Sequence, residues 1–414
     1  MHRGVAVAGL VAAVVATGSV SAAGARSATR AHDGVSIQRE PSGPAPAPSS
    51  TTTAAAPAAV TTSTTGPVPA TTTVRPAPPA PTVTATTRPP TRTTAPAPVT
   101  TVAAPGAPSR PGAAFGVYVG SASPDAAAAA FSAATGITTP YAMDFVDPTS
   151  WSTIADPAWA LSAWQGTPYR MIWGVPMLPS GTTTTLAPPL AGTSLATEAT
   201  GAYDASFTRL ATELVSYGQA HAVIRIGWEF NWSGMSWAAA TSGPAAFDGA
   251  FRHVVTAMRA APGQHFSFEW NPTVGENDIA DLAAYYPGNA YVDDIGMDVY
   301  DQAWSTYPGI ATEWSTLETE TDGLDWLAQF AAAQGKPIVL PEWGLGTWEP
   351  SAGAGADFTD TGTEVSGGDD AAFVDDMARW IASHDVVEAT FWSALDVTAG
   401  TIPSSTRALE ADFG

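Results

Sequence analysis

Two glutamates are the strongest candidates for chemistry in this sequence. Glu229 stands near the end of the apolar run AVIRIGWEF (222–230), and Glu342 stands near the end of PIVLPEW (337–343). Hydrolysis of a glycosidic bond requires two carboxyl groups flanking the bond, one of them protonated and the other ionised. If both runs are strands whose ends meet, this pair has the groups for that reaction.

The surroundings of the two acids predict which role each would take. Aromatic residues on both sides of Glu229 would desolvate its carboxyl group and favour the neutral form, as a proton donor requires. Glu342 would stay ionised if side chains from neighbouring strands donate hydrogen bonds to it. A separation of about 5–5.5 Å would let the ionised group attack the anomeric carbon with retention of configuration. A simpler interpretation stays open, because acids at strand ends also cap helices and an arginine in a strand can simply neutralise carboxylates.

Polar and aromatic side chains follow the other predicted strands as well. They are Asp144, Asp147, Trp173, Asn231, Trp270, Asn271, Asp298, Tyr300, Trp343, Trp392 and Asp396. Aromatic rings stack on the apolar faces of sugars, while carboxylates and amides bind the hydroxyl groups, so this composition is typical of a sugar-binding cleft. We expect Asp298 to brace the barrel, Glu269 to form a structural ion pair and Asp144 to line the distal cleft. An indole at a strand end is as often part of the core.

Short apolar strands alternate with helices from about residue 113 onward. The predicted strands are 115–120, 141–146, 169–176, 222–230, 265–270, 293–300, 337–343 and 387–394. The predicted helices are 124–135, 157–165, 196–217, 244–260, 277–286, 311–334 and 369–384. Eight buried strands separated by helices predict a (β/α)₈ TIM barrel of the α/β class. A doubly wound sheet would need a Gly-rich turn after its first strand, and GSASPDAA has none.

The N-terminal part of the chain has a different composition. A positive start, an apolar stretch and small residues near Ala22 and Ala25 predict a signal peptide over 1–25. Residues 26–112 are rich in Pro, Thr and Ala and hold too few large apolar residues for a core, which predicts a disordered linker. The predicted catalytic domain is 113–414, and it contains all 15 tryptophans.

Charge and composition exclude several classes of function. The chain has 38 acidic and 16 basic residues and a formal net charge of −22, so it would repel a nucleic acid. It has no cysteine, and its six histidines do not approach metal-ligand spacing. We expect no cofactor, no metal and no nucleic-acid partner.

The motif around Glu229 resembles the fourth strand of glycoside hydrolase family 26, in clan A of the retaining barrel glycosidases. In RIGWEFNWSGMSW (225–237), the family's Arg, acid/base Glu, Asn and Trp positions are held by Arg225, Glu229, Asn231 and Trp237. The resemblance implies that Glu229 is the acid/base and that the other three residues bind near it.

Three later strands extend the resemblance. IVLPEWG is similar to the seventh strand, which implies that Glu342 is the nucleophile and places Trp343 beside it as a substrate-binding candidate. DDIGMDVY is similar to the sixth strand, whose tyrosine, here Tyr300, would hydrogen-bond the nucleophile. FWSALD is similar to the eighth strand, where Trp392 would form the platform under the sugar. The family usually has His before the acid/base, whereas this chain has Trp228, so the polysaccharide stays open.

The sequence therefore predicts a secreted, monomeric, retaining glycosidase that cleaves a β-linked polysaccharide such as β-mannan or β-glucan, with no membrane segment in the mature form. Two alternatives remain open. A non-catalytic carbohydrate-binding barrel would bind glycan without cutting it, and a cell-surface structural protein would use the long linker as a stalk.

Overall fold

The computed structural model describes residues 112–182, 186–275, 277–301, 313–345 and 369–414, and the backbone of two short strands at 359–360 and 364–365. All eight predicted strands fall within these ranges. The predicted signal peptide (1–25) and the predicted linker (26–112, except Gly112) lie outside the described residues.

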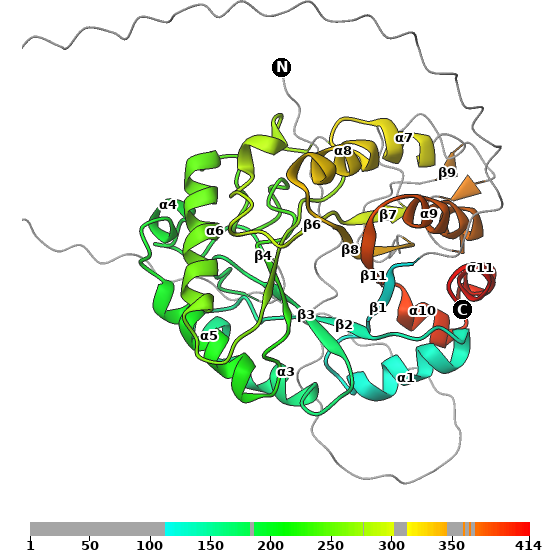
Figure 1. Cartoon of the computed structure of the whole chain (residues 1–414), viewed down its shortest axis with the longest axis horizontal. Helices are drawn as coiled ribbons and strands as arrows, with labels where there is room; N and C mark the ends of the chain where they lie inside the picture. Colours follow the sequence, from blue (N-terminus) through cyan, green and yellow to red (C-terminus); the bar gives the residue numbers. More distant parts are fainter. Residues whose placement is uncertain are drawn as a thin grey trace, which may run out of the picture. The chain divides into compact units, whose positions relative to one another are not determined.

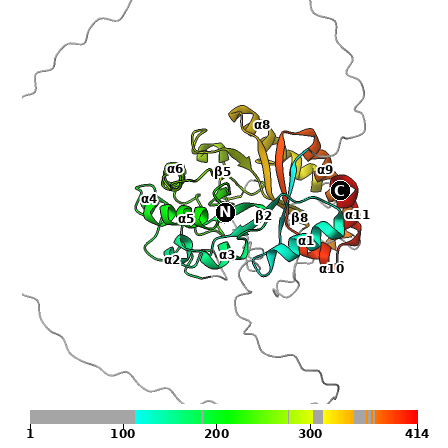
Figure 2. The same ribbon diagram turned by 60° about the horizontal axis from the view of Figure 1, so that its bottom comes forward.

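Eight parallel strands close into a barrel, as the sequence predicts (Figures 1 and 2). They are β1 (Ala114–Tyr118), β2 (Tyr141–Phe145), β3 (Arg170–Val175), β4 (Val223–Ile226), β5 (Ser267–Trp270), β6 (Asp294–Gly296) with β7 (Val299–Asp301), β8 (Ile338–Leu345) and β11 (Val386–Phe391). Each pairs with its neighbour in parallel, and β11 pairs with both β8 and β1, which closes the sheet. The carboxyl ends of all strands therefore lie at one end of the barrel, where functional groups of such barrels gather.

The sixth strand of the barrel is made of two pieces. β6 pairs with the first half of β8 and β7 pairs with its second half, with Met297 and Asp298 between them. Both pieces run in the same direction as β8, so the interruption leaves the barrel closed. It places Asp298 and Tyr300 beside the carboxyl half of β8.

Helices surround the barrel, and most of the predicted ones are present. They are α1 (Pro124–Thr135), α2 (Trp151–Ala155), α3 (Ala158–Ala163), α4 (Leu195–Glu198), α5 (Asp204–Ser216), α6 (Pro244–Arg259), α7 (Glu313–Thr319), α8 (Leu324–Gln334), α9 (Ala371–Ser383), α10 (Ala394–Ala399) and α11 (Pro403–Phe413), with a two-stranded ribbon of β9 (Thr359–Asp360) and β10 (Glu364–Val365) before α9. The predicted helix 196–217 is two helices, because Gly201 (φ 78°) interrupts it. The predicted helix 277–286 is wrong, since only a 3₁₀ turn, η1 (Leu282–Tyr285), forms there. None of the helices in the described ranges has the length and hydrophobicity to cross a bilayer.

The core has an outer layer and an inner one. Along β3, Trp173 and Val175 belong to the large core between strands and helices, whereas Ile172 points the other way. Ile172 packs with Met143 and Val223 in a small cluster inside the barrel. This alternation follows from the two-residue period of a strand. Residues that point inward near the carboxyl ends are therefore the ones that can line a site.

Candidate active site

The chain bends sharply just after β4, and this bend places Glu229. Gly227 has φ 53° and Glu229 has φ 50°, both in the left-handed region. A Cβ atom at position 227 would collide with the Met177 side chain, so glycine is required there on two grounds. The Glu229 amide donates to the Asn271 carbonyl oxygen at 2.8 Å, which ties the turn to the end of β5. The Glu229 side chain is thereby held at the carboxyl end of the barrel.

Glu342 lies within β8 and receives a hydrogen bond on each carboxylate oxygen. The Tyr300 hydroxyl donates to Oε2 at 2.6 Å. The Arg225 guanidinium donates to Oε1 through Nη1 and forms an ion pair with the carboxylate. Two donors, one of them cationic, stabilise the ionised form and fix the orientation of the group. Glu342 is thus arranged as an oriented carboxylate.

Arg225 is fully buried and forms the hub of the polar cluster. Besides Glu342, its guanidinium binds the Asp298 carboxylate through Nη2 and the Asn271 side-chain oxygen through Nε at 2.7 Å. Glu269 Oε1 lies 3.8 Å from Nε, within ion-pair distance as predicted, but burial raises the pKa of Glu269 to about 8, so this pair is charged only at alkaline pH. The surrounding carboxylates raise the pKa of Arg225 despite its burial, so it stays charged. The sequence left two roles open for Arg225, neutralising carboxylates or binding in the active site. Its contacts with Glu342 and Asp298 show the first of these.

The Glu229 carboxyl group differs from Glu342 in its electrostatics. Burial and the nearby Glu342 carboxylate raise the pKa of Glu229 to about 8, although Arg225 and a hydrogen bond with Thr273 act in the opposite direction. Glu229 is therefore protonated at neutral pH and close enough to Glu342 for the two charges to interact. One protonated and one oriented, hydrogen-bonded carboxyl group is the pairing that glycosidic cleavage requires.

Tyr300 and Asp298 complete the surroundings of Glu342. Burial and the Glu342 carboxylate raise the pKa of Tyr300 well above its usual value, so its hydroxyl keeps the proton that it donates. Burial raises the pKa of Asp298, and the contact with Arg225 partly offsets that. The carboxylate of Asp298 braces Arg225 in place, which agrees with the structural part expected of it.

Trp392 lies directly after β11 at the same end of the barrel. Its indole is partly exposed and stacks on the Tyr118 ring, with centroids 4.0 Å apart and planes 12° apart. The Tyr300 ring meets it edge-on at 6.1 Å. Trp392 therefore lies beside Tyr300, which donates a hydrogen bond to Glu342, and Tyr118 covers one of its faces.

Three predicted binding residues are core residues in the structure. Trp237 is fully buried and donates its indole N–H to the Trp228 carbonyl oxygen at 2.6 Å. Trp343 is fully buried between β8 and the helices, against Phe391. Asn231 is 1 % exposed, and its amide exchanges hydrogen bonds of 2.8 and 2.9 Å with the Thr273 backbone. These side chains have no surface to offer a substrate, so we correct their assignment from binding to support.

Asp144, which the sequence predicts to line the distal cleft, is buried. Asp144 is 3 % exposed, and its carboxylate accepts hydrogen bonds from Ser121, from the Trp164 indole at 2.7 Å and from the Phe145 amide at 2.8 Å. Its carboxylate is therefore satisfied within the protein. Tyr118 was missed altogether, although it ends the first strand as an aromatic residue, which is the signal used at the other strands.

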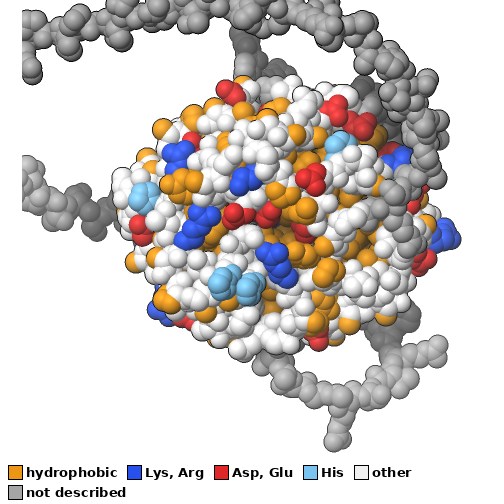
Figure 3. Space-filling view, in the orientation of Figure 1, with side chains coloured by type: hydrophobic (Ala, Val, Ile, Leu, Met, Phe, Trp, Pro, Cys, Tyr) orange, Lys and Arg blue, Asp and Glu red, His pale blue; other side chains and the backbone are white. Residues whose placement is uncertain are grey.

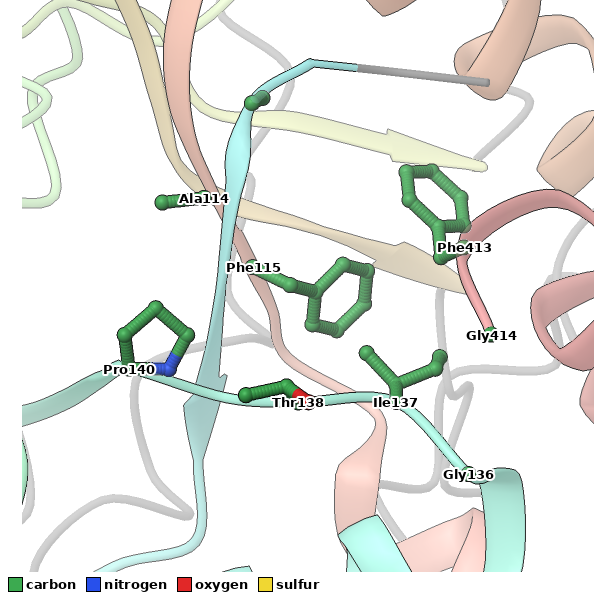
Figure 4. A pocket seen from close by; sticks show the side chains of 9 residues that line it. Ala114, Phe115, Gly136, Ile137, Thr138, Pro140, Phe413 and Gly414 are labelled. Atoms are coloured by element: carbon green, nitrogen blue, oxygen red, sulfur yellow. The ribbon is translucent and has the colours of Figure 1, made fainter.

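The hollow shown in Figure 4 lies at the other end of the barrel. It has a volume of about 390 Å³ and is lined by residues before and at the start of β1, by the segment leading to β2 and by the C-terminal Phe413 and Gly414. Strands begin here, so it is far from the carboxyl ends that carry Glu229 and Glu342. Figure 3 shows one face of the barrel, where acidic and basic side chains lie next to one another near the centre. Among the described residues, no group of three His, Asp or Glu side chains has the geometry of a metal site.

Residues 211–336 match the sequence model of glycosyl hydrolase family 26. Over these residues the chain is family 26-like. The match spans Arg225 in β4, the turn with Glu229, Asn271 after β5 and Tyr300 in β7, and it supports a glycosidase. A comparison with curated proteins gives no match.

Several solved structures of mannanases are similar to this chain. The catalytic domain of the Bacillus sp. JAMB-750 endo-β-1,4-mannanase is 16% identical, with 73% of this chain and 86% of that chain covered and a TM-score of 0.50. A double mutant of the Cellulomonas fimi endo-β-1,4-mannanase is 18% identical, with 72% and 70% covered and a TM-score of 0.49. A β-mannanase from Bacteroides ovatus is 15% identical, with 73% and 88% covered and a TM-score of 0.46. The JAMB-750 comparison supports the (β/α)₈ fold.

Proposed function

We propose that this family 26-like protein is a secreted, retaining glycoside hydrolase that cleaves a β-linked polysaccharide, either β-mannan or β-glucan, by double displacement. Glu229 is the acid/base and Glu342 the nucleophile. The observation that carries this proposal is the difference between the two carboxyl groups. Glu342 accepts hydrogen bonds from Tyr300 and Arg225 and forms an ion pair with Arg225, while Glu229 keeps its proton at neutral pH.

The first step forms a covalent glycosyl-enzyme. The proton of Glu229 passes to the glycosidic oxygen while the Glu342 carboxylate attacks the anomeric carbon. The bond between that carbon and the leaving oxygen breaks, and an ester with Glu342 replaces it. The hydrogen bonds from Tyr300 and Arg225 fix the orientation of the Glu342 carboxylate. It is thereby positioned for attack on the anomeric carbon.

The second step returns both acids to their first state. Glu229, now ionised, takes a proton from a water molecule, and the resulting hydroxide attacks the anomeric carbon. The ester bond to Glu342 breaks, and the sugar leaves with its original configuration. The two steps balance with the two glutamates, the substrate and one water molecule, and no oxidant or reductant is needed.

The family match and the mannanase names of the similar structures favour β-mannan. Because Trp228 stands where the family usually has His beside the acid/base, β-glucan remains the second substrate of this proposal. We also propose that 1–25 directs secretion, that 26–112 is a linker and that 113–414 is the catalytic domain of a monomer. The composition of each segment supports this division. Sequencing the N-terminus of protein recovered from the culture medium tests the first of these points.

Incubation with a panel of β-mannans and β-glucans, followed by an assay for new reducing ends, tests the activity. Glu342→Gln and Glu229→Gln should each lose at least about 1,000-fold in kcat, because each removes one of the two acids. The matched control is Glu213→Gln on the surface of α5, which should keep full activity. Proton NMR of the first product should show the β-anomer. Binding of glycan without release of reducing ends would instead make the protein a carbohydrate-binding barrel.

A further inference from the structure

The mouth of the barrel around Glu342 holds two kinds of side chain. The polar donors Arg225 and Tyr300 bind the Glu342 carboxylate. Aromatic rings lie near them, on three strands that are neighbours in the closed sheet. Tyr118 ends β1, Phe145 ends β2 and Trp392 follows β11.

These three rings contact one another. Tyr118 stacks on Trp392, with centroids 4.0 Å apart. Phe145 meets both rings nearly at right angles, at 5.7 Å from Tyr118 and 6.0 Å from Trp392. On its far side Phe145 lies 4.9 Å from Trp228, which is next to Glu229 in the chain. These contacts form a continuous aromatic wall that runs from Trp392 and Tyr118 through Phe145 to Trp228.

The aromatic wall packs on the core of the barrel and is partly exposed. Its rings pack on the inner cluster of Met143, Ile172 and Val223. Phe145 also fits against Gly174, where any Cβ atom would collide with its ring. Tyr118, Phe145 and Trp392 nevertheless each remain partly exposed, unlike the fully buried Trp237 and Trp343. A rigid, partly exposed aromatic surface at the carboxyl end of a barrel is suited to stacking on a pyranose ring.

Tyr118 is the member of the wall with a hydroxyl group directed at polar surroundings. Asp144 and Glu342 are close enough to its hydroxyl that both carboxylates, together with burial, raise its pKa, so the group stays protonated. Asp144 already accepts hydrogen bonds from Ser121, Trp164 and the Phe145 amide, so it does not depend on Tyr118. Within the described part of the chain, no hydrogen bond holds the Tyr118 hydroxyl. It is thus a donor available for a ligand.

We propose that Tyr118 is a substrate-binding residue for the sugar unit at the cleavage point. Its ring covers one face of Trp392 and leaves the opposite face as the stacking platform, and its hydroxyl donates a hydrogen bond to a hydroxyl group of the sugar. This inference rests on the proposed function, since it assigns a residue to the same site. The ligand is a β-linked pyranose oligosaccharide.

The test compares Tyr118→Phe with Tyr118→Ala. The phenylalanine variant keeps the stack on Trp392 and loses only the hydroxyl, so KM for a manno- or gluco-oligosaccharide should rise roughly 3- to 10-fold, as for one neutral hydrogen bond, with the melting temperature unchanged. The alanine variant also loses the support of Trp392, so kcat/KM should fall further, by at least about 30-fold. Tyr291→Phe, at the other edge of the molecule beside Arg252, is the matched control and should behave as wild type.

Oligosaccharide binding by calorimetry, in the Glu342→Gln background, gives a readout that does not depend on turnover. There Tyr118→Phe should weaken binding by the same factor as it raises KM. The proposal is overturned if the phenylalanine variant stays within twofold of its parent in both measurements, or if the Glu342→Gln protein binds no oligosaccharide. If wild type releases no reducing ends but Tyr118→Phe still weakens binding, the hydrolase function fails and the assignment of Tyr118 stands.

Discussion

Arg225 and Glu342 are 117 residues apart in the sequence and form a buried ion pair inside the barrel. The same guanidinium also binds Asp298 and Asn271, so one side chain connects four strands of the sheet at the carboxyl end. The geometry of Glu342 therefore depends on a group that is too buried to touch a sugar. Arg225 is a positioning residue in the proposed reaction.

Arg225→Lys should lose both activity and stability. A lysine has one charged nitrogen and cannot reach Glu342, Asp298 and Asn271 together, so buried carboxylates are left without a partner. We expect kcat to fall at least about 100-fold and the free energy of unfolding to fall by roughly 3–5 kcal/mol. Steady-state kinetics and urea unfolding measure the two effects. Arg209→Lys, at the exposed ion pair with Asp156, should change neither by more than a small amount.

Tyr300→Phe should lower kcat while leaving KM nearly unchanged. The variant removes one donor from Glu342 and keeps the ring that contacts Trp392. A hydrogen bond to a charged group contributes about 1.5–3 kcal/mol, so kcat should fall roughly 10- to 150-fold. A change in KM alone would contradict this assignment, because it would mean that Tyr300 contacts the substrate and does not orient Glu342.

The pH dependence of kcat/KM should report Glu229. Its pKa is raised to about 8, so the proton donor is present below pH 8 and is lost above it. We expect kcat/KM to fall about tenfold per pH unit on the alkaline side, with the midpoint near pH 8. With an aryl glycoside whose leaving group needs no proton, this fall should weaken. A profile that stays flat to pH 10 would show that Glu229 is not the acid.

The sequence predicted the barrel well, because the barrel depends on local patterns, and the same patterns place Glu229 and Glu342 near strand ends. Buried strands of three to eight residues are visible as apolar runs, and the residue at the end of each strand lies at the carboxyl end of the barrel by topology. What the sequence left undecided was the direction in which a side chain points. Glu342 and Trp343 are adjacent in one strand, so only one of them can face the inside of the barrel, and it is Glu342.

Residues after the strand ends were harder to place. Asn231 and Trp237 lie in the segment after β4, where no regular period relates position to direction. Asn231 pairs with the Thr273 backbone and Trp237 packs under Trp228, and both contacts come from the tertiary fold. The helix predicted at 277–286 failed for a local reason, since Pro287 disfavours helical backbone at the residue before it and only the 3₁₀ turn η1 forms. The Tyr118–Trp392 stack joins the first and last strands of the barrel and becomes visible only when the barrel closes.

Glu269→Gln should stabilise the protein at alkaline pH. Glu269 is 1 % exposed, its oxygens have no hydrogen-bond partner in the described ranges, and burial raises its pKa to about 8. Between about pH 4.5 and pH 8 the folded protein holds a proton that the unfolded chain releases, so stability falls as pH rises through this window. The glutamine variant lacks this loss.

Urea unfolding of wild type and Glu269→Gln at pH 5 and pH 8 measures the effect. The variant should gain stability relative to wild type by roughly 1–3 kcal/mol more at pH 8 than at pH 5, since each unit of pKa shift corresponds to about 1.4 kcal/mol. Glu213→Gln on α5 controls for the substitution itself. An equal difference at both pH values would mean that Glu269 is ionised in the folded protein.

Gly227→Ala should damage the turn that places Glu229. The residue has φ 53°, and its new methyl group would collide with Met177, so we expect a loss of roughly 2–4 kcal/mol in unfolding free energy. Gly218→Ala separates the two causes, because Gly218 has φ 82° but nothing lies within 4 Å of the methyl group that alanine would add; it should lose only about 1 kcal/mol. Since Glu229 is two residues from Gly227, kcat should fall in Gly227→Ala and stay unchanged in Gly218→Ala. Equal losses of stability in both variants would show that the contact with Met177 does not restrict the turn.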